Sequence, residues 1–291
     1  MISAATVKEL RDRTGAGMMD CKRALEQSAG DIEKAIEFLR EKGLATAAKK
    51  AGRVAKQGTV FGLQENGRAA LVEFNCETDF VAKNDSFIDL GKAMVKLVLD
   101  NGITQVEQLL ASELNGSVVQ DQLTNLIATI GENMGIRRLA FYEYGANGTV
   151  DYYSHGNGRI AVLVRLEVED AAKVNEAKIV ELAHDLSLQI VAAKAQFIAA
   201  SDINEETMEK ERQIYKTQAM NEGKPESIAI KMVEGRVRKF YEEVCLLNQF
   251  YIKDTDLQIS QIVDSLAKEI GTGIKVTDFV RFEIGEGGEE E

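Results

Sequence analysis

A segment of this 291-residue chain is repeated within it at an offset of about 90 residues. The tripeptide Gly-Thr-Val begins at 58 and again at 148, and Asn-Gly-Arg begins at 66 and again at 157. Each Asn-Gly-Arg is followed by an apolar, strand-like run (69–75 and 160–166) and then by a helical pattern (87–99 and 179–193). An Asn-Gly pair between apolar runs is typical of a tight β-hairpin. The repeat therefore predicts two related α+β subdomains, each a small antiparallel sheet backed by helices.

Residues 1–43 are predicted to form three short helices, which Asp31 and Gly43 help to delimit. Asp31 is placed to cap the third helix, and Gly43 stands where a helix C-terminal glycine belongs. The apolar positions with helical spacing are Val7 and Leu10, then Cys21, Ala24 and Leu25, then Ile32, Ala35, Ile36 and Leu39. Residues 44–56 are basic and rich in alanine, and we interpret them as a helical connector.

The last third of the chain turns helical again. Residues 205–220 and 226–247 read as two helices around a Gly-Lys-Pro turn, which predicts an antiparallel helical hairpin. A helix over 259–270 and a strand over 278–284 follow. The predicted domains are 1–56, the three-helix domain with its connector; 57–145, the first core subdomain; 146–285, the second core subdomain with the hairpin 204–248; and 286–291, an acidic tail.

The composition narrows the class of protein. The formal net charge is -12, and phosphate neutralisation needs clustered Lys and Arg, so we expect no direct nucleic-acid partner. Residues 1–56 are the exception, with 12 Lys and Arg against 8 Asp and Glu, whereas the remainder carries 23 against 39. Three widely spaced cysteines predict neither a zinc site nor a disulfide framework and fit a reducing cytosol. No signal peptide and no apolar run of about 18 residues is found, so no membrane partner is expected.

Phe80 is the first candidate for a functional side chain. It lies in the stretch EFNCETDFVAKN (73–84), between Asp79 and Lys83, just after a strand-like run. It continues the apolar period of neither a strand nor a helix, so we predict that it points outward to a partner. The aligned position of the second copy is Ala171, and a side chain that the fold itself needs should more often appear in both copies. Asp79 is predicted to cap the turn before the next helix.

Several other residues have alternative interpretations. Cys76 with His155 would make a thiol hydrolase, although alternation along the strand favours a small core residue at Cys76. The Gly-x-Gly-x-x-Ala motif at 156–161 precedes a strand, so it predicts a hairpin turn and no dinucleotide site. Adjacent methionines cannot both face one core, so one of Met18 and Met19 is predicted to face outward to a partner. Packing against the connector helix is the equal alternative.

The longest motifs resemble those of the bacterial elongation factor Ts family. Residues 14–25 (TGAGMMDCKRAL) and 73–84 resemble the two family signatures, and further similarity occurs at 130–133, 153–156, 231–236 and 281–283. The similarity covers nearly the whole chain in order. It implies a ubiquitin-associated-like three-helix N-terminal domain, a core of two related subdomains and a protruding helical hairpin, which is an α+β fold.

The resemblance also implies a function and its residues. The family exchanges guanine nucleotides on elongation factor Tu in the cytoplasm, binding its GDP-bound and nucleotide-free forms, with no cofactor, no catalytic residue and no covalent enzyme chemistry. Within Thr78-Asp79-Phe80-Val81, Phe80 would insert between helices of the partner's G domain, with Asp79 beside it, and disturb the Mg²⁺ and phosphate region. His155 would contact the same domain, and Arg11, Met18 and Met19 would touch another of its helices.

Two features depart from the family pattern, and one rival function stays open. The stretch Ala195-Gln196-Phe197-Ile198 lacks the proline usual there, and no extra C-terminal helical module, as some members carry, is expected to add contacts. A structural adaptor that binds peptides through residues 1–43 is the alternative to an exchange factor, beside the thiol hydrolase. The hairpin is also a candidate surface for a homodimer.

Overall fold

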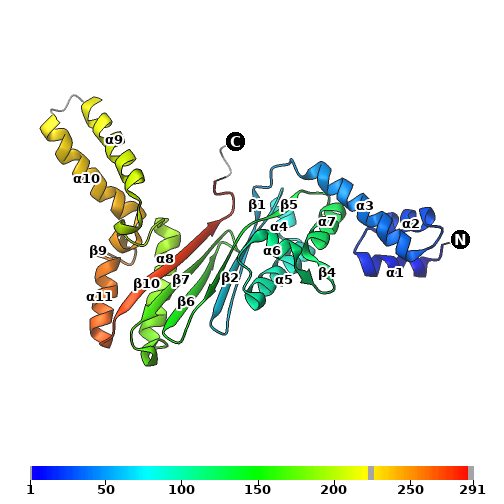
Figure 1. Cartoon of the computed structure of the whole chain (residues 1–291), viewed down its shortest axis with the longest axis horizontal. Coiled ribbons are helices and arrows are strands. Elements are labelled where there is room, and N and C mark those ends of the chain that lie inside the picture. The colour runs from blue at the N-terminus through cyan, green and yellow to red at the C-terminus, as the bar shows by residue number, and fades with distance from the viewer. Residues whose placement is uncertain (1, 222–225, 288–291) are drawn as a thin grey trace. The chain divides into compact units, whose positions relative to one another are not determined.

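The computed structural model describes residues 2–221 and 226–287, which form two compact units (Figure 1). The first unit comprises 1–143, 156–161 and 282–291, and the second comprises 144–155 and 162–281. Helices and small sheets occur in both units, which confirms the predicted α+β class. Within the described part of the chain, no helix is both long and apolar enough to cross a membrane.

The first unit begins with the three predicted helices. They are α1 (Ala4–Thr14), α2 (Met18–Gln27) and α3 (Ile32–Lys50). The Ser3 side chain caps α1 and the Asp31 side chain caps α3, where it accepts from the Lys34 backbone N–H at 3.2 Å. Leu10 and Leu25 are fully buried among the apolar faces of these helices. We call these three helices, up to Leu39, the head.

The prediction that Gly43 ends the third helix is wrong. Helix α3 runs on to Lys50, because residues 44–50 are mostly good helix formers and pack along α7 (Val119–Ile130). Gly43 is buried within the helix and faces Thr124 and Asn125. Gly43 is thus an interior residue of α3 in contact with α7, and not the helix end that the sequence indicated.

A three-stranded antiparallel sheet follows in the first unit. Its strands are β1 (Gln57–Glu65), β2 (Arg68–Cys76) and β5 (Met134–Glu143), in the order β1-β2-β5. Asn66 and Gly67 form the predicted tight turn with φ of 52° and 77°. Phe74 of β2 stacks on Phe87 with ring centroids 4.1 Å apart, at the centre of the core.

Helices and a short hairpin stand between β2 and β5. They are α4 (Asp79–Ala82), α5 (Asp85–Asn101), α6 (Val106–Ala111), β3 (Glu113–Leu114), β4 (Ser117–Val118) and α7. The predicted helix over 87–99 is α5. The strand β5 and the helix α7 were not predicted from the sequence.

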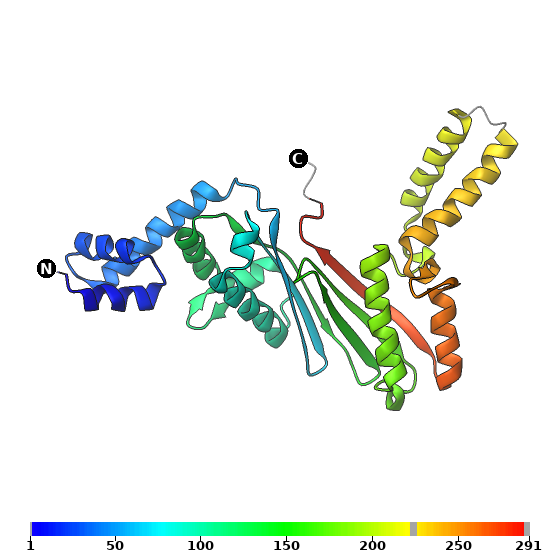
Figure 2. The ribbon, with the colours of Figure 1, turned by 180° about the vertical axis from the view of Figure 1, so that it is seen from behind.

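The second unit is built on the second copy of the repeat. Its sheet has the order β10-β7-β6, with β6 (Gly148–His155), β7 (Ile160–Val168) and β10 (Ile274–Glu283). The helix α8 (Ala177–Ala193) packs on this sheet, as Figure 2 shows, and α11 (Ile259–Ile270) belongs to the same core. The smaller elements are the 3₁₀ turns Ala171–Lys173, Ala200–Asp202 and Leu246–Asn248, with strands β8 (Phe250–Tyr251) and β9 (Asp254–Gln258). The motif at 156–161 forms the predicted turn between β6 and β7.

The predicted helical hairpin projects from the rest of the second unit (Figures 1 and 2). It consists of α9 (Glu205–Asn221) and α10 (Glu226–Val244), and the predicted turn at 222–225 lies outside the described residues. At the start of the hairpin, where the usual proline is missing, the backbone N–H groups of Gln196 and Phe197 donate to the Val244 carbonyl at 2.8 and 3.0 Å. These bonds fix the path of the chain into α9.

Candidate partner-binding site

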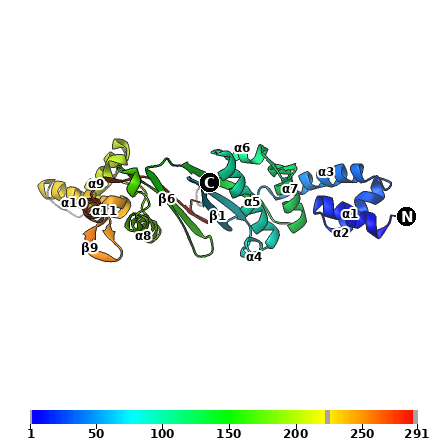
Figure 3. The same ribbon diagram turned by 90° about the horizontal axis from the view of Figure 1, so that it is seen from below.

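Phe80 lies on α4, a single helical turn between β2 and α5 (Figure 3). Its side chain is 81 % exposed, the highest value among the large apolar side chains of the described residues. Its neighbour Val81 is buried in the core of the first unit. The short helix therefore anchors one side with Val81 and presents the Phe80 ring to solvent on the other. The outward position predicted for Phe80 is confirmed.

Thr78 caps this helix, so the prediction that Asp79 is the cap is wrong. The Thr78 Oγ1 accepts from the Val81 backbone N–H at 3.4 Å, and Asp79 is already the first helical residue. Thr78 is itself fastened by Glu132: its N–H donates to Oε2 at 3.0 Å and its hydroxyl donates to Oε1 at 2.7 Å. A threonine hydroxyl serves as donor and acceptor at once, which an aspartate cannot do.

Glu77 makes a second set of polar contacts just before α4. Its Oε1 accepts from the Asn133 backbone N–H at 2.6 Å, and its Oε2 lies 3.5 Å from Arg53 Nη1. The hydrogen bond from Asn133 holds the pKa of the Glu77 carboxyl below its ordinary value. The loop between α7 and β5 thus holds the residues before α4 at two successive positions.

Asp79 remains at the surface next to Phe80. Its carboxylate pairs with Lys83 at 2.7 Å, and this hydrogen bond holds the Asp79 pKa below its ordinary value. The exposed surface of α4 therefore combines an aromatic ring and a carboxylate, which together suit a partner surface with an apolar crevice and a nearby hydrogen-bond donor.

Cys76 does not have the surroundings of a nucleophile. It is fully buried at the end of β2, its thiol donates to the Thr78 carbonyl at 3.1 Å, and burial raises its pKa to about 12. The thiolate needed for covalent chemistry is then absent at neutral pH. The core position predicted from strand alternation is confirmed.

His155 lies at the end of β6 in the second unit, beside Tyr153. The Tyr153 hydroxyl and His155 Nδ1 are 3.0 Å apart, and the Tyr153 ring packs edge-on against His184 at 5.5 Å. His184 Nδ1 lies 3.4 Å from the Asp151 carboxylate. The two histidines of the chain thus flank one tyrosine, and His155 is exposed.

The head presents a separate group of candidate residues. Met18 and Met19 open α2 and are 46 % and 64 % exposed, so both face solvent, whereas only one of them was predicted to. Arg11 is exposed in the last turn of α1, before the turn at 15–17 that joins the two helices. Flexible thioethers next to a guanidinium suit a protein partner.

The structure thus brings the candidates into three groups. Thr78 to Val81 form one helical turn, Arg11 and the methionines flank one turn of the head, and His155 stands in the second unit. Glu132, which fixes Thr78, was not singled out from the sequence, although it lies in one of the similar stretches, 130–133. Among residues 2–221 and 226–287, no group of three His, Cys, Asp or Glu side chains is arranged to hold a metal ion.

The comparisons with known proteins agree with one another. The sequence profile of the family described as Elongation factor TS matches residues 77–286. The chain is 51 % identical to elongation factor Ts of Clostridium botulinum over 290 residues, with 99 % of this chain and 94 % of the relative covered. It is 50 % identical to elongation factor Ts of Clostridium perfringens and of Clostridium acetobutylicum, with the same coverage. The chain belongs to the elongation factor Ts family.

Proposed function

We propose that this chain is the guanine-nucleotide exchange factor of elongation factor Tu. It binds the GDP-bound form in the cytoplasm and promotes GDP release, after which GTP binds. The family membership supports elongation factor Tu as the partner. The observation that supports the mechanism is the exposed ring of Phe80, which lies on a helical turn held in place by hydrogen bonds. Neither bond making nor bond breaking is required of the chain.

Phe80 acts as the inserted group. A phenylalanine ring buries a large apolar area when it enters a crevice, and such anchors dominate binding energy at protein interfaces. Its 81 % exposure in the free chain means that nearly all of this area remains to be buried in the complex. Asp79 stands beside the ring, so insertion brings a negative charge toward the Mg²⁺ and phosphate region of the G domain. The consequence is weaker binding of GDP.

Thr78 and Val81 hold the ring in place. Val81 is buried in the core and Thr78 is bonded to Glu132, so inserting the ring does not displace the turn that carries it. A group that is fixed before binding loses little conformational entropy on insertion.

The thermodynamic basis is linkage between two ligands of one protein. A factor that binds nucleotide-free elongation factor Tu more tightly than the GDP-bound form weakens GDP binding by the same factor. Contacts of Arg11, Met18 and Met19 with another helix of the G domain, and of His155 with the same domain, add to the affinity. These contacts support binding, whereas Phe80 and Asp79 supply the difference between the two forms.

Release of a fluorescent GDP analogue from elongation factor Tu tests the proposal. The wild-type chain should accelerate release strongly, and Phe80→Ala should reduce the acceleration by about 30-fold or more, since truncating a dominant interface residue costs about 2 kcal/mol or more. Phe250→Ala is the matched control, because Phe250 is also an exposed aromatic (46 %) but belongs to the second unit. Equal acceleration by wild type and Phe80→Ala would remove the ring from the mechanism. A folded wild-type chain without any effect would contradict the function and favour the adaptor.

The hairpin also remains a candidate surface for a homodimer. Ile214 and Met220 of α9 and Ile230 of α10 are about half exposed, which supports an apolar contact between two copies. Sedimentation equilibrium of the chain measures this directly, and a monomer at all micromolar concentrations would contradict the dimer.

A further inference from the structure

Helix α3 belongs to two packed regions of the first unit at once. Near its start, Ala35 and Leu39 are buried with the apolar residues of α1 and α2. Near its end, Ala47 packs against the core formed by the first sheet, α5 and α7. One uninterrupted helix of 19 residues therefore joins the head to the part of the unit that carries Phe80.

Gly43 of α3 faces α7 where the two helices pack together. A Cβ atom at this position would lie 3.6 Å from Asn125 Oδ1, 3.7 Å from Thr124 Cγ2 and 3.9 Å from Ala128 Cβ. These are ordinary van der Waals distances, so an alanine would fit, whereas a side chain as large as phenylalanine would press on Thr124, Asn125 and Ala128. Glycine inside a helix costs roughly 0.5–1 kcal/mol relative to alanine, so the helix itself gives no reason for it. The observed approach of α3 to α7 therefore allows a small residue at position 43 but not a bulky one.

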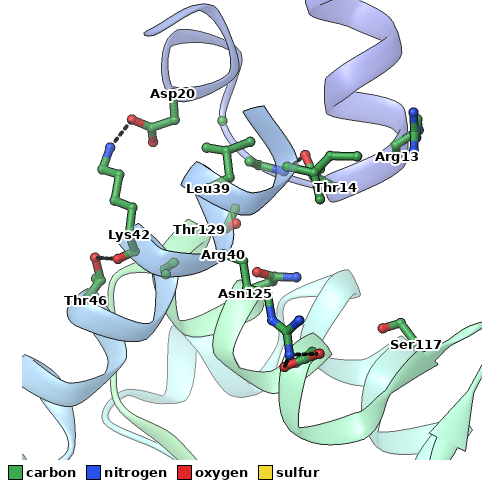
Figure 4. A pocket seen from close by; sticks show the side chains of 16 residues that line it. Arg13, Thr14, Asp20, Leu39, Arg40, Lys42, Thr46, Ser117, Asn125 and Thr129 are labelled. Carbon is green, nitrogen blue, oxygen red and sulfur yellow. Dashed lines mark hydrogen bonds and ion pairs between the residues drawn. The ribbon is translucent and has the colours of Figure 1, made fainter. Parts of the chain in front are cut away.

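Two ion pairs of α3 residues just before Gly43 fix the direction of the helix. Lys42 pairs with Asp20 of α2 at 2.5 Å, and Arg40 pairs with Asp121 of α7 at 3.0 Å (Figure 4). The hydrogen bond from Lys42 holds the pKa of Asp20 below its ordinary value. Asp20 follows Met18 and Met19 directly in α2. The ion pair between Lys42 and Asp20 thus connects the start of α2, with Met18 and Met19, to the segment of α3 that crosses α7.

A cavity lies beside the crossing of α3 and α7. This hollow of about 280 Å³ is lined by side chains that include Thr14, Leu39, Thr46 and Thr129 (Figure 4). Beside this hollow, the contact at Gly43 and the ion pair between Arg40 and Asp121 oppose a rotation of the head relative to α7.

We infer that the crossing at Gly43 is a positioning device for exchange: it holds Met18 and Met19 at a fixed place relative to Phe80, so that both surfaces meet the partner together. The inference rests on the proposed function and goes beyond it, because Gly43 touches no partner. Two binding surfaces that are held rigidly relative to each other bind one partner with higher affinity, because forming the second contact costs little additional conformational entropy.

The first measurement concerns the free chain and does not depend on exchange. Spin labels on Glu9→Cys of α1 and Gln108→Cys of α6 report the distance between head and core, since both sites are exposed and the three native cysteines are buried. Gly43→Ala should leave the distance distribution unchanged, and Gly43→Phe should shift or broaden it. An unchanged distribution in a folded Gly43→Phe chain would overturn the inference.

The second measurement is GDP release from elongation factor Tu as a function of factor concentration. Gly43→Phe should raise the half-saturating concentration about 10-fold with the maximal acceleration kept, because Phe80 is intact, whereas Gly43→Ala should behave as wild type. Met19→Ala should weaken binding in the Gly43→Ala chain but add little to Gly43→Phe, where the contact is already lost. A full additive effect of Met19→Ala, or a loss of maximal acceleration instead of affinity, would contradict positioning.

Two controls distinguish a variant that does not fold from a failure of the proposed function or of the inference. If Gly43→Phe does not fold, Gly43→Val introduces a smaller branched side chain at the same place and is judged by the same criteria. If the wild-type chain does not accelerate GDP release, the proposed function fails, and the inference about exchange fails with it. A shifted label distance with wild-type exchange would leave the proposed function standing and overturn the inference alone.

Discussion

Thr78 and Glu132 are 54 positions apart in the sequence, and both carboxylate oxygens of Glu132 accept hydrogen bonds from Thr78, one from its backbone N–H and one from its hydroxyl. This pairing joins the end of the second strand to the loop before β5. It leaves the Thr78 hydroxyl oxygen able to cap α4, the turn that carries Phe80. The helical turn that carries the exposed Phe80 ring is therefore held in place by Glu132, from a distant segment of the chain.

Removing the Glu132 carboxylate should weaken exchange while the ring itself is unchanged. Glu132→Ala leaves two donors of Thr78 without their acceptor, and we expect about a 10-fold loss in the acceleration of GDP release, because hydrogen bonds to charged groups contribute about 1.5–3 kcal/mol. Glu132→Gln keeps one acceptor oxygen, so its acceleration of GDP release should lie between those of the wild-type chain and Glu132→Ala. Glu107→Ala, an exposed glutamate of α6, is the control for loss of charge. Wild-type exchange by Glu132→Ala would show that α4 needs no such support.

Arg138 should be essential for the stability of the first unit. Glu73 is fully buried in β2, and its carboxylate lies 2.6 Å from Arg138 Nε and 3.7 Å from Arg137 Nη1. Arg138→Met leaves the buried charge without its nearer partner, and the free energy of unfolding should fall by roughly 3–5 kcal/mol. Urea unfolding followed by circular dichroism measures this.

A double-mutant cycle separates the ion pair from the packing of Arg138. The guanidinium also lies over the Phe282 ring at 4.3 Å, and methionine preserves part of that contact. Glu73→Gln combined with Arg138→Met should cost less than the sum of the single changes, since the unpaired charge is gone. Arg137→Met is the matched control with a smaller expected loss. Strictly additive costs would exclude a direct coupling between Glu73 and Arg138.

Cys76 should make stability fall at alkaline pH. Burial raises its folded-state pKa to about 12 from an ordinary value of 9.0, so the unfolded chain loses the thiol proton first. Its contribution is fully present below pH 9 and is lost as the pH rises from about 9 toward 12. The free energy of unfolding of Cys76→Ala should therefore decline less steeply over this range than that of wild type. Parallel declines would show that the thiol does not titrate differently in the two states.

The same thiol gives an independent check through its reactivity. A thiol-specific reagent at pH 8 should modify Cys76 only at the rate at which the native structure opens, whereas denatured chain should react at once. Rapid modification of the native chain at Cys76 would contradict its burial.

The elements with a local sequence pattern could be predicted before the structure was known. Two Asn-Gly turns between apolar runs predicted both β-hairpins, and helical spacing predicted the head, α5, α8, α11 and the hairpin α9–α10. Phe80 was identified because it fits neither period, and its exposure is confirmed. These predictions depend only on neighbouring residues, since turns and amphipathic periods are set within a few positions of the chain.

Contacts between distant segments became visible only in the folded chain. The sequence indicated Gly43 as a helix end and Asp79 as a cap, but α3 continues past Gly43 along α7, and Thr78, which Glu132 holds, caps α4 instead of Asp79. The third strand of the first sheet, β5, pairs with β2 from about 60 residues away and was not predicted. A glycine, a threonine or an apolar run is compatible with several local structures. Which of them forms depends on the residues packed against it, because contacts between segments far apart in sequence contribute more free energy than local propensity does.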